Sequence, residues 1–222
     1  MANRKDRPGA QEWVPADPTS ASLATAMQDC RGCELWRDAT QAVPGQGRRD
    51  APLMLVGEQP GDREDVEGLP FVGPAGQLLA RALDDAGLDQ QKVYRTNAVK
   101  HFRWRGTRGK QRIHQTPGLV HIAACGPWMV AELHLVTPRG LVLLGGTAGK
   151  AVYGSSFRVG EMRGTLRELP EELPGHHVPS HRPDWVLPTT HPAAVLRSRD
   201  RDAHYELFVA DLKVAATALA DG

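Results

Sequence analysis

The chain has 222 residues, 41% apolar content and five tryptophans, which is enough for one α/β domain with a short tail. Its net charge of +1 argues neither for nor against a nucleic-acid partner. No run approaches the roughly 18 apolar residues that cross a membrane, and the N-terminus has no signal-peptide core, so we expect a cytoplasmic protein without a membrane partner.

The first residues predict a tail that leads to a cysteine pair. Residues 1–20 are polar, proline-rich and without periodicity, so we expect a flexible tail, followed by a single domain over 21–222. An amphipathic segment at 22–27 precedes Cys30-Arg31-Gly32-Cys33. With Cys125 the cysteines number three and cannot pair evenly, which favours metal or cluster ligation. The C-x-x-C pair alone also fits a redox pair or a zinc knuckle.

A strand and a polar loop follow. The apolar run Leu53–Val56 predicts a buried strand, and Gly57 begins a loop rich in Gly, Pro and acids, including Glu58, Gln59, Asp62 and Asp65. After the turn Pro70–Pro74 we expect a helix from near Ala75, ended by Gly87. Open α/β folds bind ligands in loops at strand ends, although a surface loop with scattered acids is the alternative.

The remaining elements alternate. We expect a strand at 93–99, a basic loop at 100–115 and a helix that starts at Thr116-Pro117 and ends near 136. There follow a strand at 140–145, a short helix at 147–152, an irregular segment at 157–185 with short edge strands near 162–169, a strand at 185–190 and a helix at 202–219. Alternating strands and helices predict an α/β fold whose parallel sheet is covered on both faces.

Positive charge is concentrated in the basic loop. Between Arg95 and Ala131 there is no acidic residue, and the basic residues are Arg95, Lys100, Arg103, Arg105, Arg108, Lys110 and Arg112. Such a stripe is typical of contact with a phosphate backbone. A solvated loop, or a contact with the acidic loop at 58–67, is the alternative.

Four motifs in order resemble the uracil-DNA glycosylase superfamily, most closely its iron-sulfur branch. They are the glycine-acid loop at 57–61, the turn at 70–74, Thr96-Asn97, and His191-Pro192-Ala193-Ala194-Val195-Leu196-Arg197, and the match spans about 29–212. The resemblance implies a three-layer α/β/α sandwich with a central four-stranded parallel sheet. It implies a monomer in the bacterial cytoplasm, associated with the nucleoid, that acts on uracil-containing DNA, preferentially single-stranded and also double-stranded.

The resemblance also implies roles for single residues. Phe71 would stack on a flipped uracil and Asn97 would read its polar edge, with Gly57, Gln59 and Asp62 in the same pocket. His191 would donate a hydrogen bond to the departing uracil oxygen, although a buried structural histidine is the alternative. Val195 and Leu196 would wedge into the space left by the base, and Arg197 would contact phosphate.

In the iron-sulfur branch a C-x-x-C pair combines with two later ligands to hold a [4Fe-4S] cluster. Cys30, Cys33 and Cys125 match three ligand positions, and His101 in Val99-Lys100-His101 stands where relatives carry cysteine, so the resemblance implies His101 as the fourth ligand. Zinc bound by the same four side chains is the alternative. We expect the cluster to organise the basic loop, since hydrolysis needs no electron transfer.

The basic loop also resembles that of the UdgX class, whose members become covalently joined to DNA. Gly109-Lys110-Gln111-Arg112-Ile113-His114 resembles its Lys-Arg-Arg-Ile-His loop, with Gln111 in place of an arginine. The resemblance implies that His114 attacks C1′ after uracil leaves, that Glu58 stabilises the sugar cation and orients or deprotonates His114, and that Lys110 and Arg112 contact DNA. The alternatives are a phosphate contact for His114, a turnover glycosylase whose water is positioned by Glu58, and a cluster-bearing DNA-binding protein without activity.

Overall fold

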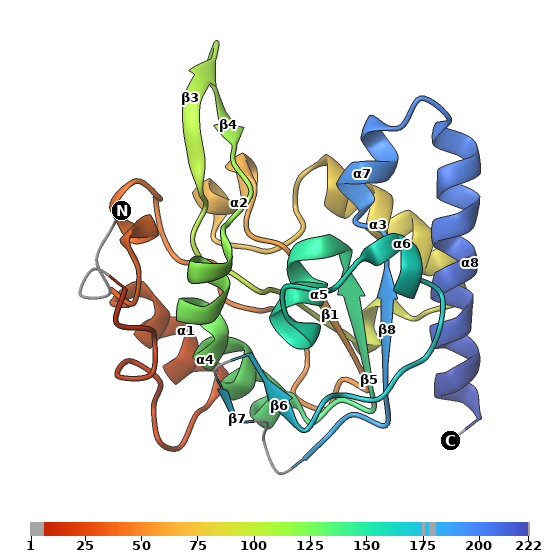
Figure 1. Ribbon diagram of the computed structural model, residues 1–222, viewed down its shortest axis with the longest axis horizontal. Helices are drawn as coiled ribbons and strands as arrows, with labels where there is room; N and C mark the ends of the chain where they lie inside the picture. The colour runs from red at the N-terminus through yellow and green to blue at the C-terminus, as the bar shows by residue number, and fades with distance from the viewer. Residues whose placement is uncertain (1–6, 175, 178–180, 222) are drawn as a thin grey trace.

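A sheet of four parallel strands lies at the centre of the protein, described here from a computed structural model over residues 7–174, 176–177 and 181–221 (Figure 1). Across the sheet the strands are ordered β2 (Val93–Asn97), β1 (Leu53–Gly57), β5 (Gly140–Leu144) and β8 (Trp185–Thr189). All neighbouring pairs are parallel. The four strands that the sequence predicts are thus confirmed, with small differences at their ends.

Helices cover both faces of this sheet. Met54 and Val56 face one apolar core with helices α1, α4 and α5, whereas Leu53 and Leu55 face a second core with α3, α7 and α8. The predicted α/β/α sandwich is confirmed, because alternate side chains of each strand point to opposite faces. The helices are α1 (Ser20–Gln28), α2 (Asp62–Glu67), α3 (Pro74–Asp85), α4 (Leu119–Val136), α5 (Gly145–Tyr153), α6 (Val159–Met162), α7 (Pro192–Arg197) and α8 (Arg201–Ala220), with 3-10 helices η2 (Glu34–Arg37) and η3 (Gln90–Lys92).

The basic loop is a β-hairpin, which the sequence analysis does not anticipate. Strands β3 (Trp104–Arg108) and β4 (Gln111–His114) pair antiparallel, and Gly109 has a left-handed φ of 63° in the turn. The hairpin stands out from the body of the protein beside α2 (Figure 1). Its side chains are largely exposed, so they lack the apolar alternation that marks a strand in the sequence.

Other boundaries also differ from those expected. Helix α4 begins at Leu119 instead of Thr116, because the N–H of Gly118 is capped by Nδ1 of His121 at 2.9 Å. The short edge pair is β6 (Glu172–Leu173) with β7 (His176–His177), and the segment near 162–169 contributes only the isolated bridge Arg167–Val186 among the described residues.

Part of the expected tail is packed against the domain. The backbone N–H of Gly9 donates to Gly32 O at 3.0 Å, and that of Ala10 donates to Ala124 O at 2.8 Å. Ala10 is buried, and Arg7 forms an ion pair with Glu34. The polar, proline-rich composition of 1–20 predicts flexibility, and it does not reveal these partners, which lie far along the chain. Residues 1–6 are outside the described part.

Helix α4 is apolar because it lies in the core. It is long and apolar enough, by length and composition alone, to cross a membrane, which differs from the expectation that no segment has this property. In the fold, however, 67% of that span is buried, and it carries the charged Glu132. Burial between the sheet and the N-terminal segment therefore accounts for its composition.

A buried ion pair joins α4 to the end of β2. Nζ of Lys100 lies 2.6 Å from Oε2 of Glu132, and their side chains are 1% and 0% exposed. The same ammonium donates to Thr96 Oγ1 at 2.6 Å and to Asn97 O at 2.9 Å, and Glu132 Oε1 accepts from Gly45 N. Lys100 therefore serves the core and is absent from the basic surface that the sequence predicts.

Removing this lysine is expected to be strongly destabilising. In Lys100→Met the Glu132 carboxylate loses its cation without access to water, which should lower the free energy of unfolding by about 3–5 kcal/mol. Guanidinium unfolding measures this change. Arg63→Met, which breaks the exposed pair with Glu67, is the matched control and should change stability little. Equal unfolding midpoints for both variants would contradict this account.

Candidate functional site

Polar side chains gather where the parallel strands end. Glu58 follows β1, Asn97 ends β2, Thr147 follows β5 and His191 follows β8. Carboxyl ends of parallel strands share one edge of the sheet, and ligands of open α/β folds bind at that edge. The sequence analysis identifies three of these residues and misses Thr147, although its place just after a buried strand is the same signal.

Asn97 and Phe71 meet at the last residue of β1. A Cβ on Gly57 would lie 2.4 Å from Asn97 Oδ1 and 2.6 Å from Phe71 Cζ, so only glycine lets both side chains approach the backbone here. Phe71 has a left-handed φ of 59°, which is uncommon for a bulky residue and occurs where the surroundings impose it. A flat ring and a buried amide thus lie together, as the sequence predicts.

Glu58 contacts two other side chains. Its Oε2 accepts a hydrogen bond from Thr147 Oγ1 at 2.6 Å, and its Oε1 lies 3.2 Å from Nε2 of His114 at the end of the hairpin. Burial by itself would raise the pKa of Glu58, but hydrogen bonds from His114 and Thr147 and the charges of His114 and His191 lower it. Glu58 is therefore an anion at neutral pH, and His114, 45% exposed, stands at its open side.

His191 is fixed in one tautomer. It is the N-cap of α7, and its Nδ1 accepts the N–H of Ala193 at 3.1 Å. Burial lowers the pKa of His191 to about 4, against the attraction of Glu58, so the ring is neutral and its proton resides on Nε2. Gly145, with a φ of 86°, lets His191 pack closely, since a Cβ there would lie 2.8 Å from His191 Cβ.

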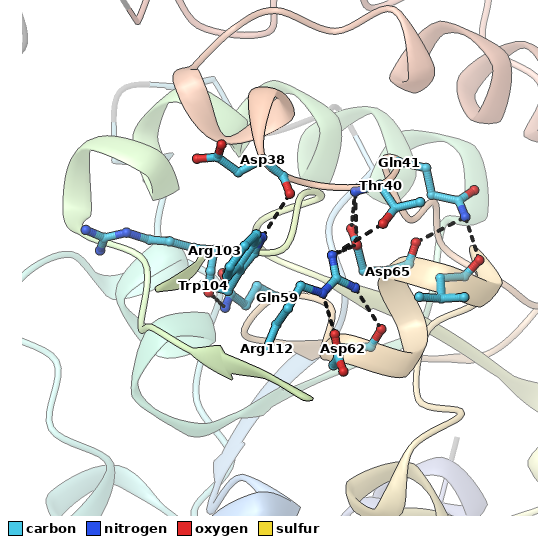
Figure 2. Close-up of polar contacts among 10 residues, drawn as sticks. Asp38, Thr40, Gln41, Gln59, Asp62, Asp65, Arg103, Trp104 and Arg112 are labelled. Carbon is cyan, nitrogen blue, oxygen red and sulfur yellow. Dashed lines mark hydrogen bonds and ion pairs between the residues drawn. The ribbon is translucent and has the colours of Figure 1, made fainter. Parts of the chain in front are cut away.

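Gln59 lies beside this site but is engaged by the hairpin. Its Nε2 donates to Arg103 O at 3.0 Å and its Oε1 accepts from Arg103 N at 3.0 Å (Figure 2). The same Nε2 also lies 3.3 Å from Gln115 O. Both ends of the hairpin are thus bound to one buried amide. Gln59 was expected to contact uracil, but both polar atoms of its amide already have partners in the hairpin.

Arg112 and Asp62 also hold the hairpin. Arg112 Nε lies 2.5 Å from Asp62 Oδ1 and its Nη1 lies 2.7 Å from Asp65 Oδ2 (Figure 2). The guanidinium also lies over the rings of Phe102 and Trp104. The Arg112 side chain is only 17% exposed. Arg112 therefore contacts the acidic loop instead of solvent, which differs from its expected contact with DNA. Asp62 is held by Arg112, which differs from its expected place in the uracil pocket. On the hairpin, exposed basic side chains remain at Arg105, Arg108 and Lys110.

The expected wedge is divided between core and surface. Helix α7 turns Val195 into the second apolar core, where it is fully buried. Leu196 is partly buried and lines a groove between α3, α7 and α8, and Arg197 is exposed. The expectation for Val195 is wrong, because a six-residue helix places neighbouring residues on different faces.

Three of the four expected metal ligands, the cysteines, lie near one another beside the N-terminal half of α4. Cys30, Cys33 and Cys125 are buried free thiols, and the three interact electrostatically with one another. Cys125 Sγ accepts from Lys100 N at 3.3 Å, next to His101, and Cys30 Sγ accepts from Trp128 Nε1 at 3.4 Å. These N–H donors suit sulfur that carries negative charge, so the donor set fits a thiolate-bound group.

Burial sets the protonation of these ligands. It lowers the pKa of His101 to about 4, which keeps the imidazole neutral as a metal ligand must be. Burial raises the pKa of Cys33 to about 11, so this thiol keeps its proton near neutral pH and would release it on binding a metal. Among the described residues, no group of three or more His, Cys, Asp or Glu is arranged to hold a single metal ion.

Comparisons with known proteins agree with this geometry. A model of the uracil DNA glycosylase superfamily matches residues 44–213. A type-4 uracil-DNA glycosylase of Saccharolobus solfataricus is 31% identical over 179 residues, which are 78% of this chain and 76% of that protein. One of Thermotoga maritima is 32% identical over 186 residues, 81% of this chain and 84% of that protein. A type-5 uracil-DNA glycosylase of Pyrobaculum aerophilum is 31% identical over 153 residues, 61% of this chain and 62% of that protein.

The matched segment includes all four strands of the sheet and the residues at their ends, from Glu58 to His191. It covers well over half of the sequence. The chain belongs to the uracil DNA glycosylase superfamily.

Proposed function

We propose that this protein excises uracil from DNA. The observation that carries the proposal is the placement of His191 and the Glu58 carboxylate at the same strand edge as the Phe71 ring and the Asn97 amide, which meet at Gly57. Phe71 stacks on the extruded base and Asn97 pairs with the uracil edge, which cytosine presents with donor and acceptor reversed.

Charge separation determines the roles of the other groups. When the C1′–N1 bond breaks, its electron pair leaves with uracil and positive charge develops on the sugar. The Nε2–H of His191 donates to the departing uracil oxygen, where a fixed donor is most effective. Glu58 faces the sugar and stabilises its cation. Lys110, Leu196 and Arg197 contact the DNA around the pocket, single-stranded DNA being the preferred substrate because its base is already accessible.

We further propose that His114 captures the sugar. A ring nitrogen of His114 gives its lone pair to C1′, and the resulting imidazolium keeps its proton on the other nitrogen, next to Glu58. The 3.2 Å contact between His114 Nε2 and Glu58 Oε1 supports this step, since it holds the nucleophile at the carboxylate before DNA arrives. An alkylated imidazole is a poor leaving group, so turnover stops.

The function is tested with uracil-containing oligonucleotides, single-stranded and double-stranded, by measuring free uracil and by separating the products on a denaturing gel. We expect stoichiometric uracil release and a protein–DNA band that survives heat and detergent, and neither with thymine in place of uracil. Many uracils released per protein with no stable band would instead support hydrolysis by a water positioned at Glu58.

Cys30, Cys33, His101 and Cys125 are proposed to hold a [4Fe-4S] cluster. When bound, it would supply a covalent link between the N-terminal loop, the turn after β2 and α4, and none of the bond-breaking steps involves it. The link would fix His101 three residues before the first strand of the hairpin. In this way the cluster would organise the hairpin that carries His114.

Loss of one ligand is expected to remove the cluster. Cys125→Ala should lose the visible absorbance of freshly purified protein and most of its bound iron, measured by absorption and metal analysis. His134→Ala, an exposed histidine of the same helix, is the control and should keep both. Zinc in place of iron in the unsubstituted protein would contradict the cluster and support the mononuclear alternative.

A further inference from the structure

The first turn of α5 contacts both catalytic side chains. Gly145 packs against His191, and two residues later Thr147 donates to Glu58. Thr147 is buried, with 5% of the residue exposed, and its hydroxyl lies 2.6 Å from the carboxylate. None of the roles described so far uses this hydroxyl, although it is the shortest hydrogen bond that Glu58 makes.

We propose that Thr147 is a positioning residue that fixes Glu58 through Oε2 and so leaves Oε1 for His114 and the sugar. This inference rests on the proposed function of Glu58. A carboxylate on a flexible side chain has two equivalent oxygens and several rotamers. The hydroxyl of Thr147 binds Oε2 from α5, and Oε1 then lies toward the half-exposed His114.

The hydroxyl also stabilises the charged form of Glu58. The groups facing this carboxylate are Thr147 from α5, His114 from β4 and His191 before α7, and each favours its ionised state against the effect of burial on its pKa. Without the Thr147 donor the pKa of Glu58 should rise. Glu58 acts as an anion, so the acid limb of the activity profile should then move to higher pH.

The test compares Thr147→Val, which replaces the hydroxyl by a methyl of similar shape, with Thr147→Ser, which keeps the hydroxyl. Gly146→Ala is a control in the same turn, because a Cβ at Gly146 would meet no atom within 4 Å. Single-turnover rates of uracil release and adduct formation are measured across pH, together with the affinity for uracil-containing DNA. The pKa of the Glu58 carboxyl is measured by NMR in each protein without DNA.

We expect Thr147→Val to slow adduct formation by about tenfold to a hundredfold, in line with the loss of a hydrogen bond to a charged group. Affinity for DNA should be nearly unchanged, because Phe71 and Asn97 are untouched. The acid limb and the NMR pKa of Glu58 should both shift upward, and Thr147→Ser should restore most of the rate and both pKa values.

Thr147→Val with a wild-type rate and an unshifted Glu58 pKa would overturn the inference. So would Thr147→Ser that is as slow as Thr147→Val, because a retained hydroxyl would then fail to restore the rate. If the unsubstituted protein releases no uracil, the proposed function fails, while the NMR comparison still decides whether Thr147 holds Glu58.

Discussion

Replacing His114 by alanine is expected to abolish the covalent band completely while uracil release continues. The imidazole is 45% exposed and stands at the open side of Glu58, so its removal leaves room for water at that carboxylate. Phe71, Asn97 and His191 remain, and uracil should still leave at a rate within about tenfold of the unsubstituted protein, since the leaving-group contact is intact. The sugar cation is then captured by water, and the protein should turn over.

Two measurements on the same samples check this result. A denaturing gel detects the adduct, and chromatography of the released base counts uracils per protein. His204→Ala, an exposed histidine of α8, should behave as the unsubstituted protein. An adduct that persists in His114→Ala would assign the covalent bond to another residue, and loss of both adduct and uracil release would make His114 part of base excision itself.

Replacing His191 by alanine is expected to slow uracil release and adduct formation together, by about 10²–10³-fold, the usual effect of removing a donor at developing negative charge. Both reactions suffer equally because His191 acts on the bond-breaking step that precedes capture. His191→Asn separates this role from helix capping, since asparagine also caps Ala193 but is too short to reach the base. It should be nearly as slow as His191→Ala and more stable.

The pH dependence follows from the lowered pKa of His191. A pKa of about 4 in the folded protein lies below the unperturbed value of about 6.5, so the folded state resists protonation of this ring. Stability linked to His191 is therefore present above pH 6.5 and is lost as the pH falls toward 4. The rate of uracil release, measured from pH 5 to 8, should not depend on a positively charged His191. A rate that falls near neutral pH because His191 loses a proton would contradict the assignment of His191 as a neutral hydrogen-bond donor.

The strands and the positions of site residues at their ends could be predicted because both depend on local sequence. Buried parallel strands are mostly apolar runs, and polar residues stand at their ends: Glu58 directly follows β1, Asn97 ends β2, and His191 comes two residues after β8. Thr147 follows β5 in the same way, after two glycines, but no motif of the sequence marked it. Its contact with Glu58 joins residues 89 apart in the chain, which only the fold reveals.

Residues of the hairpin could not be assigned correctly from charge alone. Arg112 lies in a basic stripe, yet its partners Asp62 and Asp65 come from α2, some fifty residues earlier. The resemblance implies a place for Gln59 in the pocket, but its side chain turns toward the hairpin ends. In both cases the role of the residue depends on a partner that is distant in the sequence. The exposed charges of the hairpin are those of Arg105, Arg108 and Lys110.

The motif from His191 to Arg197 was found in the correct order, but the role expected for Val195 was wrong. His191 and Arg197 lie where a strand end and a helix end place them, whereas Val195 packs in the core and Leu196 lies at its edge. Six residues are too few for hydrophobic periodicity to show which face is buried.

The central claim, that His114 becomes bonded to C1′ as uracil leaves, is tested most directly by intact mass measurement after mixing the protein with a single-stranded oligonucleotide that contains one uracil. We predict one species with the mass of protein plus oligonucleotide minus uracil, with the modification on the peptide that contains His114 after digestion. Free protein together with an abasic oligonucleotide, and no joined species, would contradict the claim.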